Sequence, residues 1–339
     1  LYTADGGILQ AGAAYFQIVA FAYLPMALST VLSAWLRCKD HAAIPFLASL
    51  GAVAANTGLN YLLIFGKLGF APMGVRGAAI ATLISQLLNF LLILLGFAAG
   101  LKKDGTHPLW TLHFTTITLR KYAGMVLPIL VSEFLWSLGQ NVESAVYGHL
   151  GTANLAAYTL TCPIQSLIVG ALSGLSAAAG VMVGKQLGRK AYDAAYRDAR
   201  SIMLTGLVGS VCVAALLMLF AGTYTGLYRV AADVQALGKT LLIVFALYAP
   251  VKVENMILSG GILRSGGKTK LILVIDTLGT WGIGVPLCLL GAYVLHWGIV
   301  GVYALLTTEE IIRLLISLFI FQNRSWMVSL SDKKTGYAP

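Results

Sequence analysis

Nine long apolar segments constrain the fold of this chain more than any other feature of its sequence. A helix that crosses the hydrocarbon core of a bilayer needs roughly 20 apolar residues, and every one of these segments is long enough. They lie at residues 11–35, 43–65, 77–100, 122–148, 156–183, 201–222, 238–262, 270–295 and 299–321. We therefore predict an all-α polytopic membrane protein with about nine transmembrane helices.

The composition agrees with a membrane protein and excludes several other classes. Hydrophobic residues make up 58% of the chain and charged residues only 11%, whereas soluble domains are about 25% charged. The net charge of +10 indicates basic cytoplasmic loops rather than a nucleic-acid partner. The four cysteines and five histidines are scattered without metal-ligand spacing, so we expect neither a metal site nor a disulfide framework.

The distribution of Lys and Arg predicts the orientation of the chain. Seventeen of these residues, Arg264 among them, lie in one set of connections and in the C-terminal tail, and four lie in the alternate connections. Because basic residues collect in cytoplasmic loops, we expect the first set, and with it the C-terminus, in the cytoplasm of a cell whose plasma membrane holds the protein. Lys252 and Arg313 lie within apolar segments.

One long polar connection, "LKKDGTHPLWTLHFTTITLRK" at residues 101–121, suggests a boundary between two lobes. We predict a partial N-lobe of three helices at residues 1–100 and a cytoplasmic linker at 101–121. A C-lobe of six helices at 122–323 and a cytoplasmic tail at 324–339 follow.

An internal repeat supports this division. The stretch "FAYLPMALSTVLSAWLR" (21–37) resembles "ALYAPVKVENMILSGGILR" (246–264), with two residues inserted in the second copy. "GVRGAAIA" (74–81) resembles "GIVGVYAL" (298–305). Both copies run in the same direction, which indicates a parallel, pseudo-two-fold repeat of the kind that transporters use. The first lobe is then incomplete.

Five motifs in order resemble the multidrug and toxic compound extrusion (MATE) family of cation-coupled antiporters. They are "LRCKDHAAIP" (36–45), "NTGLNYLLIFG" (56–66), "GVRGAAIAT" (74–82), "VGKQLGRKAYDAA" (183–195) and "GGILRSGGKTK" (260–270). The resemblance covers residues 9–323. It implies a two-lobe MATE-like bundle in which this chain corresponds to helices four to twelve of twelve, so we expect an N-terminal truncation.

The resemblance implies efflux of cationic or amphipathic small molecules in exchange for sodium ions or protons. On this interpretation the protein is no enzyme, uses no cofactor besides the coupling ion, and works as a monomer in the bilayer without nucleic acid. A flippase of lipids or lipid-linked saccharides is the alternative, and its cavity would be rich in Arg and Lys. An intramembrane enzyme would need a metal pair or a nucleophile–base set, and the sequence has neither.

Glu133 is the first candidate site residue, because an acid at membrane depth usually has a function. It lies five residues past Pro128 in the fourth apolar segment. The family resemblance implies a cation-binding Glu eight residues past this proline, where Trp136 stands here, and Glu133 lies one turn earlier on about the same face. The alternative is a carboxylate that only bonds another helix.

Lys252 and Glu254 lie near the middle of the seventh apolar segment. Two residues apart, they do not face each other on a helix, so each needs a partner elsewhere, and Glu133 with Lys252 is a plausible pair. The resemblance implies an Asp at the position of Val253. We expect Glu254 to take its binding role, with a structural ion pair as the alternative.

Asn56, Asn60 and Thr82 form a second candidate set, in the first lobe. The resemblance to the archaeal branch of the family implies Asn, Asp and Thr at these places, in a proton or sodium site. Asn60 stands where that Asp would be, and an amide oxygen ligates a hard cation without supplying charge. Interhelical amide hydrogen bonds are the alternative.

The remaining membrane-depth acids have less specific signals. Asp276 lies close to the cytoplasmic end of its segment, where it acts as a cap or gate or is simply solvated. Glu143 lies near the outer end of its segment, and we expect it at headgroup level or at a cavity mouth. Glu309 and Arg313 are four residues apart, which predicts an ion pair within one helix.

Overall fold

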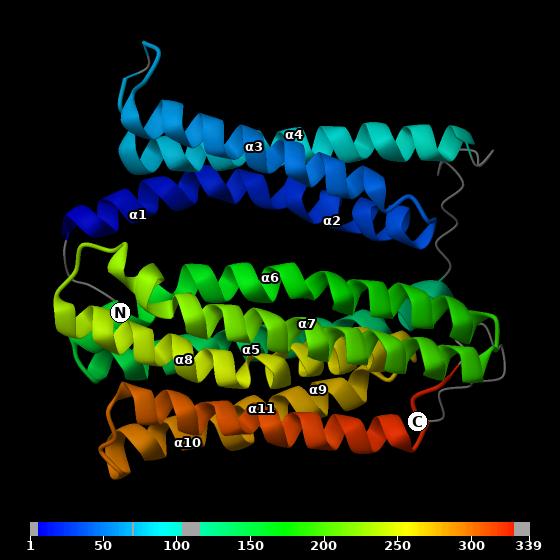
Figure 1. Cartoon of the computed structure of the whole chain (residues 1–339). Coiled ribbons are helices and arrows are strands. Elements are labelled where there is room, and N and C mark those ends of the chain that lie inside the picture. Colours follow the sequence, from blue (N-terminus) through cyan, green and yellow to red (C-terminus); the bar gives the residue numbers. More distant parts are fainter. Residues whose placement is uncertain (1–5, 70, 104–115, 329–339) are drawn as a thin grey trace. The chain divides into compact units, whose positions relative to one another are not determined.

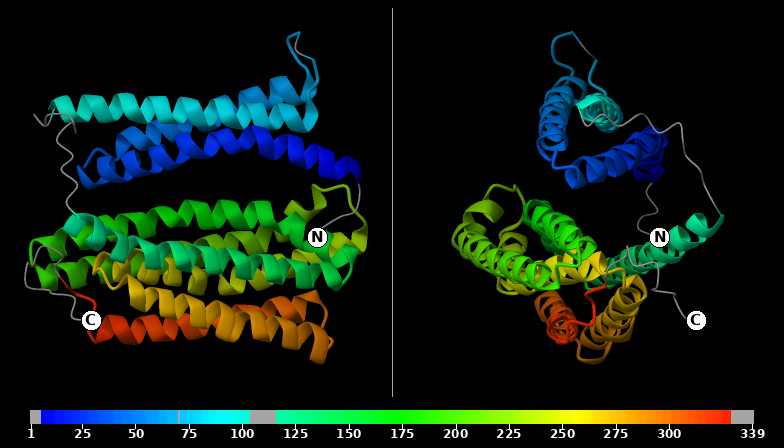
Figure 2. Two further views of the ribbon diagram at one scale, coloured as in Figure 1. Left: turned by 180° about the vertical axis from the view of Figure 1, so that it is seen from behind. Right: turned by 90° about the vertical axis from the view of Figure 1, so that its right-hand side faces the viewer.

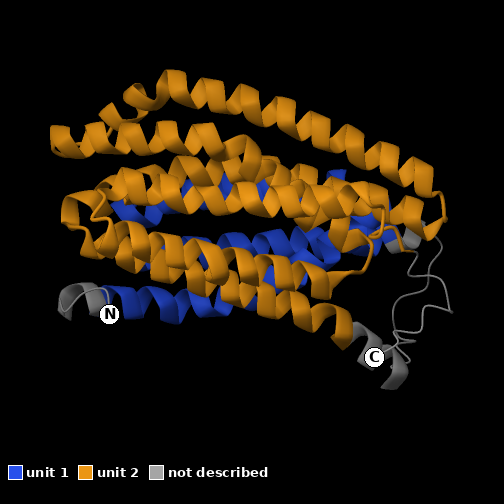
Figure 3. Ribbon diagram, turned by 90° about the horizontal axis from the view of Figure 1, so that it is seen from below, with its two compact units in different colours: residues 1–113 blue, residues 114–339 orange. Residues whose placement is uncertain are grey.

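The structure is a computed structural model that describes residues 6–69, 71–103 and 116–328, almost all of them in helices (Figure 1). No strand occurs in these ranges. The chain divides into two compact units, residues 1–113 and 114–339 (Figure 3), and within each unit the helices run alongside one another (Figures 1 and 2). The predicted all-α class is confirmed.

Unit 1 contains four helices and a short 3-10 turn. They are α1 (Gly6–Val19), η1 (Ala20–Ala22), α2 (Tyr23–Cys38), α3 (Ala43–Phe65) and α4 (Gly74–Lys103). The sequence predicts one span at 11–35, whereas the chain bends between α1 and α2 (Figure 1). Pro25 explains the bend, because a proline has no N–H to donate to the carbonyl four residues before it.

The helices of unit 1 pack closely through small side chains. A Cβ added to Gly77, near the start of α4, would lie 2.7 Å from the backbone oxygen of Leu63, near the end of α3. Glycine therefore allows the two backbones to touch there, as is common between transmembrane helices. The apolar core is small, with Leu36, Ala48 and Ile93 buried.

Unit 2 contains seven α-helices and three π-helical segments. In chain order they are α5 (Thr116–His149), α6 (Thr152–Gly188), α7 (Tyr192–Gly226), α8 (Ala232–Asn255), η2 (Met256–Leu263), α9 (Thr269–Thr277), η3 (Leu278–Gly284), α10 (Val285–Leu289), η4 (Leu290–Val294) and α11 (Ile299–Gln322). Helices extend into both ends of the predicted linker at 101–121, because α4 continues to Lys103 and α5 begins at Thr116, and the boundary between the two units lies inside it. Residues 104–115 lie outside the described residues.

The π-helix η2 continues α8 without a break and falls within the inserted copy of the repeat. A π-helix accommodates extra residues in a helix by shifting its hydrogen bonds from i→i+4 to i→i+5. The two residues inserted between Pro250 and Arg264, relative to 21–37, therefore have a structural explanation.

Eight helical segments of the described chain are long and apolar enough to cross a membrane. The ninth predicted span, α11, is 24 residues long but carries Glu309, Glu310 and Arg313. In the most apolar stretch of Ala232–Leu263, 56% of the residues are buried, against 17–22% in the six preceding spans. The α8–η2 helix is therefore the interior helix of unit 2, and the protein is a multi-pass membrane protein.

Candidate functional site

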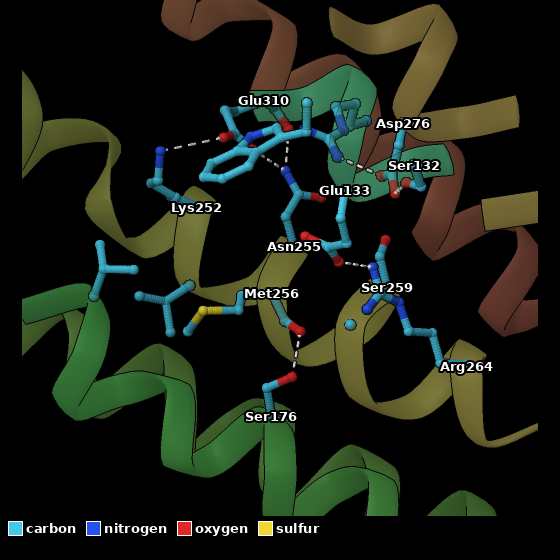
Figure 4. Close-up of a pocket in the computed structure, with 15 residues that line it drawn as sticks. Ser132, Glu133, Ser176, Lys252, Asn255, Met256, Ser259, Arg264, Asp276 and Glu310 are labelled. Atoms are coloured by element: carbon cyan, nitrogen blue, oxygen red, sulfur yellow. Dashed lines mark hydrogen bonds and ion pairs between the residues drawn. The ribbon is translucent and has the colours of Figure 1, made fainter. Parts of the chain in front are cut away.

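A cavity of about 340 Å³ lies inside unit 2, between α5, α6, α8–η2, α9 and α11 (Figure 4). We call it the charged cavity, because three acids and three bases line it: Glu133, Lys252, Arg264, Asp276, Glu310 and Arg313. Charged groups at membrane depth are costly unless they pair or reach water. Each of these six side chains forms an ion pair within the cavity wall.

Glu133 on α5 pairs with Arg264, which follows the last residue of η2. The Arg264 Nη2 atom donates to Glu133 Oε1 over 2.9 Å (Figure 4). The predicted pairing of Glu133 with Lys252 is therefore wrong. The sequence prediction also counted Arg264 among the cytoplasmic connections, but the helix continues through this residue and directs its side chain into the cavity.

Lys252 on α8 pairs instead with Glu310 on α11. The Lys252 Nζ atom lies 3.7 Å from Glu310 Oε1. Asn255 holds the same acid more closely, because its Nδ2 atom donates to Glu310 Oε2 and to the Glu310 backbone oxygen, both over 2.7 Å. Asn255 thereby fixes the carboxylate, and the longer contact leaves the Lys252 ammonium group more freedom to move.

Asp276 on α9 is buried, so the solvated interpretation is wrong, and its role as a cap or gate stays a prediction. Its carboxylate accepts a hydrogen bond from Ser132 Oγ over 2.6 Å and forms an ion pair with Arg313. Arg313 also donates to Glu309 Oε1 over 3.2 Å, which confirms the predicted pair within α11. One guanidinium group therefore pairs with two acids and joins α9 to α11.

Glu254 does not line the charged cavity, although its neighbours Val253 and Asn255 do. It is buried, and its Oε1 atom has no hydrogen-bond partner. A Cβ added to Gly206 on α7 would lie 3.2 Å from this oxygen, so the side chain points toward α7. The structure therefore separates Glu254 from Glu133 and Lys252, and its binding role stays a prediction.

The candidates of unit 1 form a neutral hydrogen-bonded cluster. Asn60 Nδ2 donates to Asn56 Oδ1 over 3.0 Å, and Asn56 Nδ2 donates to Ser85 Oγ over 3.1 Å. Thr82 does not join them by its side chain, because its hydroxyl group donates to the Ala78 backbone oxygen. Ser85 donates to the Thr82 backbone oxygen over 2.9 Å. The cluster joins α3 to α4 through amides and hydroxyls.

Two positions are predicted for Glu143, headgroup level and a cavity mouth. The residue is buried, with 4% of its surface exposed, which argues against a solvated headgroup position. It lies three turns beyond Glu133 on α5 and accepts a hydrogen bond from Gln140 Nε2 over 2.9 Å. Together with four tyrosines it lines a second, smaller cavity of unit 2.

Comparisons with known proteins show which family the chain resembles. The family model described as MatE matches residues 128–290, which include Glu133, Lys252, Arg264 and Asp276. The "Uncharacterized transporter YisQ" of Bacillus subtilis is 23% identical over 319 residues, 92% of this chain and 68% of that protein. The "Probable multidrug resistance protein NorM" of Pasteurella multocida is 30% identical over 258 residues, 74% of this chain and 53% of that protein. The chain is similar to proteins of the MATE family.

Solved structures of MATE transporters share the fold of this chain. One is described as "Outward-facing conformation of a multidrug resistance MATE family transporter of the MOP superfamily", with a TM-score of 0.83 at 19% identity over 95% of this chain and 71% of that one. The bent form of the Vibrio cholerae MATE transporter VcmN has a TM-score of 0.76 at 19% identity over 91% and 68%. The chain spans little more than half of the length of the NorM relative.

Four residues of the charged cavity that hold its acids or its π-helix are not among the site residues predicted from the sequence. Ser132 holds Asp276, Asn255 holds Glu310, and Ser176 Oγ donates to the Met256 backbone oxygen at the start of η2 over 2.7 Å. The fourth is Arg264. The sequence contains a signal for Arg264, because the repeated Leu-Arg pair sets an arginine directly at the end of the seventh apolar segment.

Proposed function

We propose that the protein is a secondary active antiporter that exports cationic or amphipathic small molecules in exchange for sodium ions or protons. The observation that carries this proposal is the ion pair between Glu133 and Arg264 in the wall of the charged cavity. The Glu133 side chain is 54% exposed, whereas the other carboxylates of the ion-pair network are 8–16% exposed. Glu133 is therefore the acid that an entering cation reaches first.

Exchange follows from competition for one carboxylate. A cationic substrate that binds Glu133 must displace the Arg264 guanidinium group, and a proton or sodium ion on Glu133 must displace the substrate. Two ligands that exclude each other at one site cannot both be carried, which is the basis of antiport. Coupling to transport also requires that each ligand favours a different arrangement of the protein, by a difference in binding free energy.

The remaining acids of the network already have partners in the cavity wall. Arg313 pairs with both Asp276 and Glu309, and Glu310 pairs with Lys252 and accepts a hydrogen bond from Asn255. The excess of basic residues in one set of connections supports a cytoplasmic C-terminus. The names of the NorM relatives as multidrug resistance proteins support drug-like substrates for this chain as well.

A flippase of lipids or lipid-linked saccharides is the second candidate function. One observation favours it, because Arg264 raises the number of cations in the cavity wall to three. Against it, each of these cations already faces a carboxylate, so the wall offers no surplus of positive charge to a phosphate. We therefore rank the flippase second.

Dye efflux from proteoliposomes tests the antiport proposal. The protein is reconstituted with a fluorescent cationic dye, and a sodium or a proton gradient is imposed. We expect gradient-driven dye movement in the wild-type protein and its loss in Glu133→Gln, which removes the charge and keeps the shape. Dye movement that Glu133→Gln leaves intact would contradict the mechanism. Movement of a fluorescent lipid without movement of any dye would favour the flippase.

A further inference from the structure

The chain beyond α11 folds back onto unit 2. Trp326 follows the end of this helix, is fully buried, and donates from its indole Nε1 atom to the Phe321 backbone oxygen over 3.1 Å. The two residues share one apolar cluster with the last residues of η2, Ile262 and Leu263, which are buried as well. The described start of the predicted tail at 324–339 therefore packs against the end of η2.

Phe321, Arg324 and Trp326, which we call the tail clasp, form a stack with the start of α7. The Trp326 and Phe321 rings lie 5.6 Å apart and nearly parallel, and Phe321 stacks on Tyr196 over 4.8 Å. Arg324 has a φ of 52°, a left-handed conformation that turns the chain between the two rings of the clasp. Its guanidinium group lies over the Tyr196 ring at 4.4 Å and pairs with Asp193 over 3.2 Å. The tail clasp therefore ties the end of α11 to the start of α7, which lie at one end of unit 2 (Figure 1).

The tail clasp also touches the turn between η2 and α9. A Cβ added to Gly266 would overlap the Trp326 backbone oxygen, so a glycine is needed for this contact. Gly266 is buried and lies two residues after Arg264. The Gly267 N–H group donates to the Arg264 backbone oxygen over 3.0 Å, and its φ of 75° favours glycine. Trp326 thus packs directly against the turn that begins at Arg264, whose side chain pairs with Glu133 in the charged cavity.

The ion pair with Glu133 does not by itself fix the Arg264 side chain. The Arg264 Nη2 atom donates to Glu133, whereas its buried Nε atom has no hydrogen-bond partner among the described residues. The Glu133 side chain is 54% exposed, and an ion pair that water reaches is weak. The backbone of the turn therefore decides where the guanidinium group lies. Trp326 restrains that turn, because a close-packed interior leaves its neighbours little freedom.

We propose that Trp326 is a positioning residue of the charged cavity, which holds the turn after η2 so that the Arg264 guanidinium group stays on Glu133. This inference rests on the proposed competition between Arg264 and a cationic substrate for the Glu133 carboxylate. When the tail clasp is loosened, Arg264 leaves Glu133 more readily, and an organic cation binds more tightly. Loss of a residue with a purely structural role would weaken binding or leave it unchanged, so the direction of the change separates the two roles.

Equilibrium binding of tritiated tetraphenylphosphonium to the purified full chain in detergent tests the inference. Arg264→Gln is expected to tighten binding by about fivefold, the upper range for a partly exposed ion pair, and Trp326→Ala by about twofold to fivefold. The two substitutions combined should bind like Arg264→Gln alone, because the clasp acts through the arginine. Trp326→Phe keeps a stacked ring and should bind like the wild-type protein.

Control variants keep the measurement specific. Thermal unfolding shows that each variant is folded. Trp297→Ala removes an exposed tryptophan beyond the opposite end of α11 and is expected to leave binding unchanged. If Trp326→Ala fails to fold, Arg324→Gln decides, because it removes the exposed end of the stack and should tighten binding by about twofold.

Three results would overturn the inference. Unchanged or weaker binding in Trp326→Ala, with tighter binding in Arg264→Gln, would show that the clasp does not position the arginine, and would leave the antiport proposal standing. Tighter binding in the combined variant than in Arg264→Gln, or equal tightening in Trp297→Ala, would place the effect elsewhere in the protein. Unchanged binding in both Arg264→Gln and Glu133→Gln would contradict the antiport proposal, and this inference with it.

Discussion

The two units differ most where their sequences correspond. The match between 74–81 and 298–305, continued along α4 and α11, aligns Ser85, Gln86 and Asn89 with Glu309, Glu310 and Arg313. Unit 1 thus has uncharged polar groups where unit 2 has two acids and a base. Hydrogen bonds suffice to join α3 and α4, whereas α9 and α11 are joined by an ion pair. The charged chemistry of the described chain is concentrated in unit 2.

A second difference lies in the helices that begin these repeats. The α2 helix is regular from Tyr23 to Cys38, whereas α8 changes to the π-helix η2 at Met256. In α2, the hydroxyl of Ser29 bonds the Pro25 carbonyl of the same helix. In η2, the Met256 carbonyl accepts from Ser176 of another helix. The insertion therefore opens the helix to a neighbour at the edge of the charged cavity.

The largest change in the free energy of unfolding is expected when Arg313 of unit 2 is removed, since unit 1 has the uncharged Asn89 at the corresponding position. Arg313→Met should lower the free energy of unfolding by about 3–5 kcal/mol, because two buried acids lose their counter-charge. Asn89→Leu, at the corresponding place in unit 1, should change it by about 1 kcal/mol or less, since the Asn89 Oδ1 atom has no partner to lose. Thermal unfolding in detergent measures both. Equal losses of unfolding free energy in Arg313→Met and Asn89→Leu would contradict the proposed difference between the two units.

The next effect concerns the close contact of η2 with α6. A Cβ added to Gly261 would lie 2.4 Å from the Ser176 backbone oxygen, so Gly261→Ala must push the helices apart. We expect a loss of about 1–3 kcal/mol of unfolding free energy. Gly174→Ala, on α6 with open space at its Cβ, should be neutral or slightly stabilising. A neutral Gly261→Ala would show that the packing of η2 is not as described.

A smaller effect is expected at the hydroxyl that holds η2. Ser176→Ala removes the hydrogen bond to the Met256 carbonyl and should reduce the unfolding free energy by about 1 kcal/mol. Ser29→Ala removes only a bond within α2, which helices lose at little cost. Urea unfolding of both variants checks the difference. A larger loss of unfolding free energy in Ser29→Ala than in Ser176→Ala would contradict the proposed difference between α2 and η2.

The smallest effect should come from the neutral cluster of unit 1. Asn60→Ala removes one amide hydrogen bond to Asn56 and should reduce stability by about 0.6 kcal/mol, the average for such bonds between membrane residues. The shift should not depend on the sodium concentration, because no charge is involved. A sodium-dependent shift in thermal unfolding would show that unit 1 holds the ion after all.

The helical fold could be predicted because long apolar segments leave few alternatives in a bilayer. The pair of Glu309 and Arg313 could also be predicted, since spacing along one helix fixes which side chains meet. The partners of Glu133 and Asp276 could not, because they come from residues 131 and 37 positions away in the sequence. The π-helix changes the helical register after Met256 and thereby the direction of the Arg264 side chain. A regular period of 3.6 residues does not predict this direction.

Binding of an organic cation to the protein without any gradient tests the central claim most directly. Tritiated tetraphenylphosphonium would be titrated into the purified protein, Glu133→Gln and Asn60→Ala, side by side. The account predicts that Glu133→Gln loses about tenfold or more in affinity and that Asn60→Ala binds like the wild-type protein. Unchanged affinity in Glu133→Gln, with weakened binding in Asn60→Ala, would move the cation site out of the charged cavity and contradict the account.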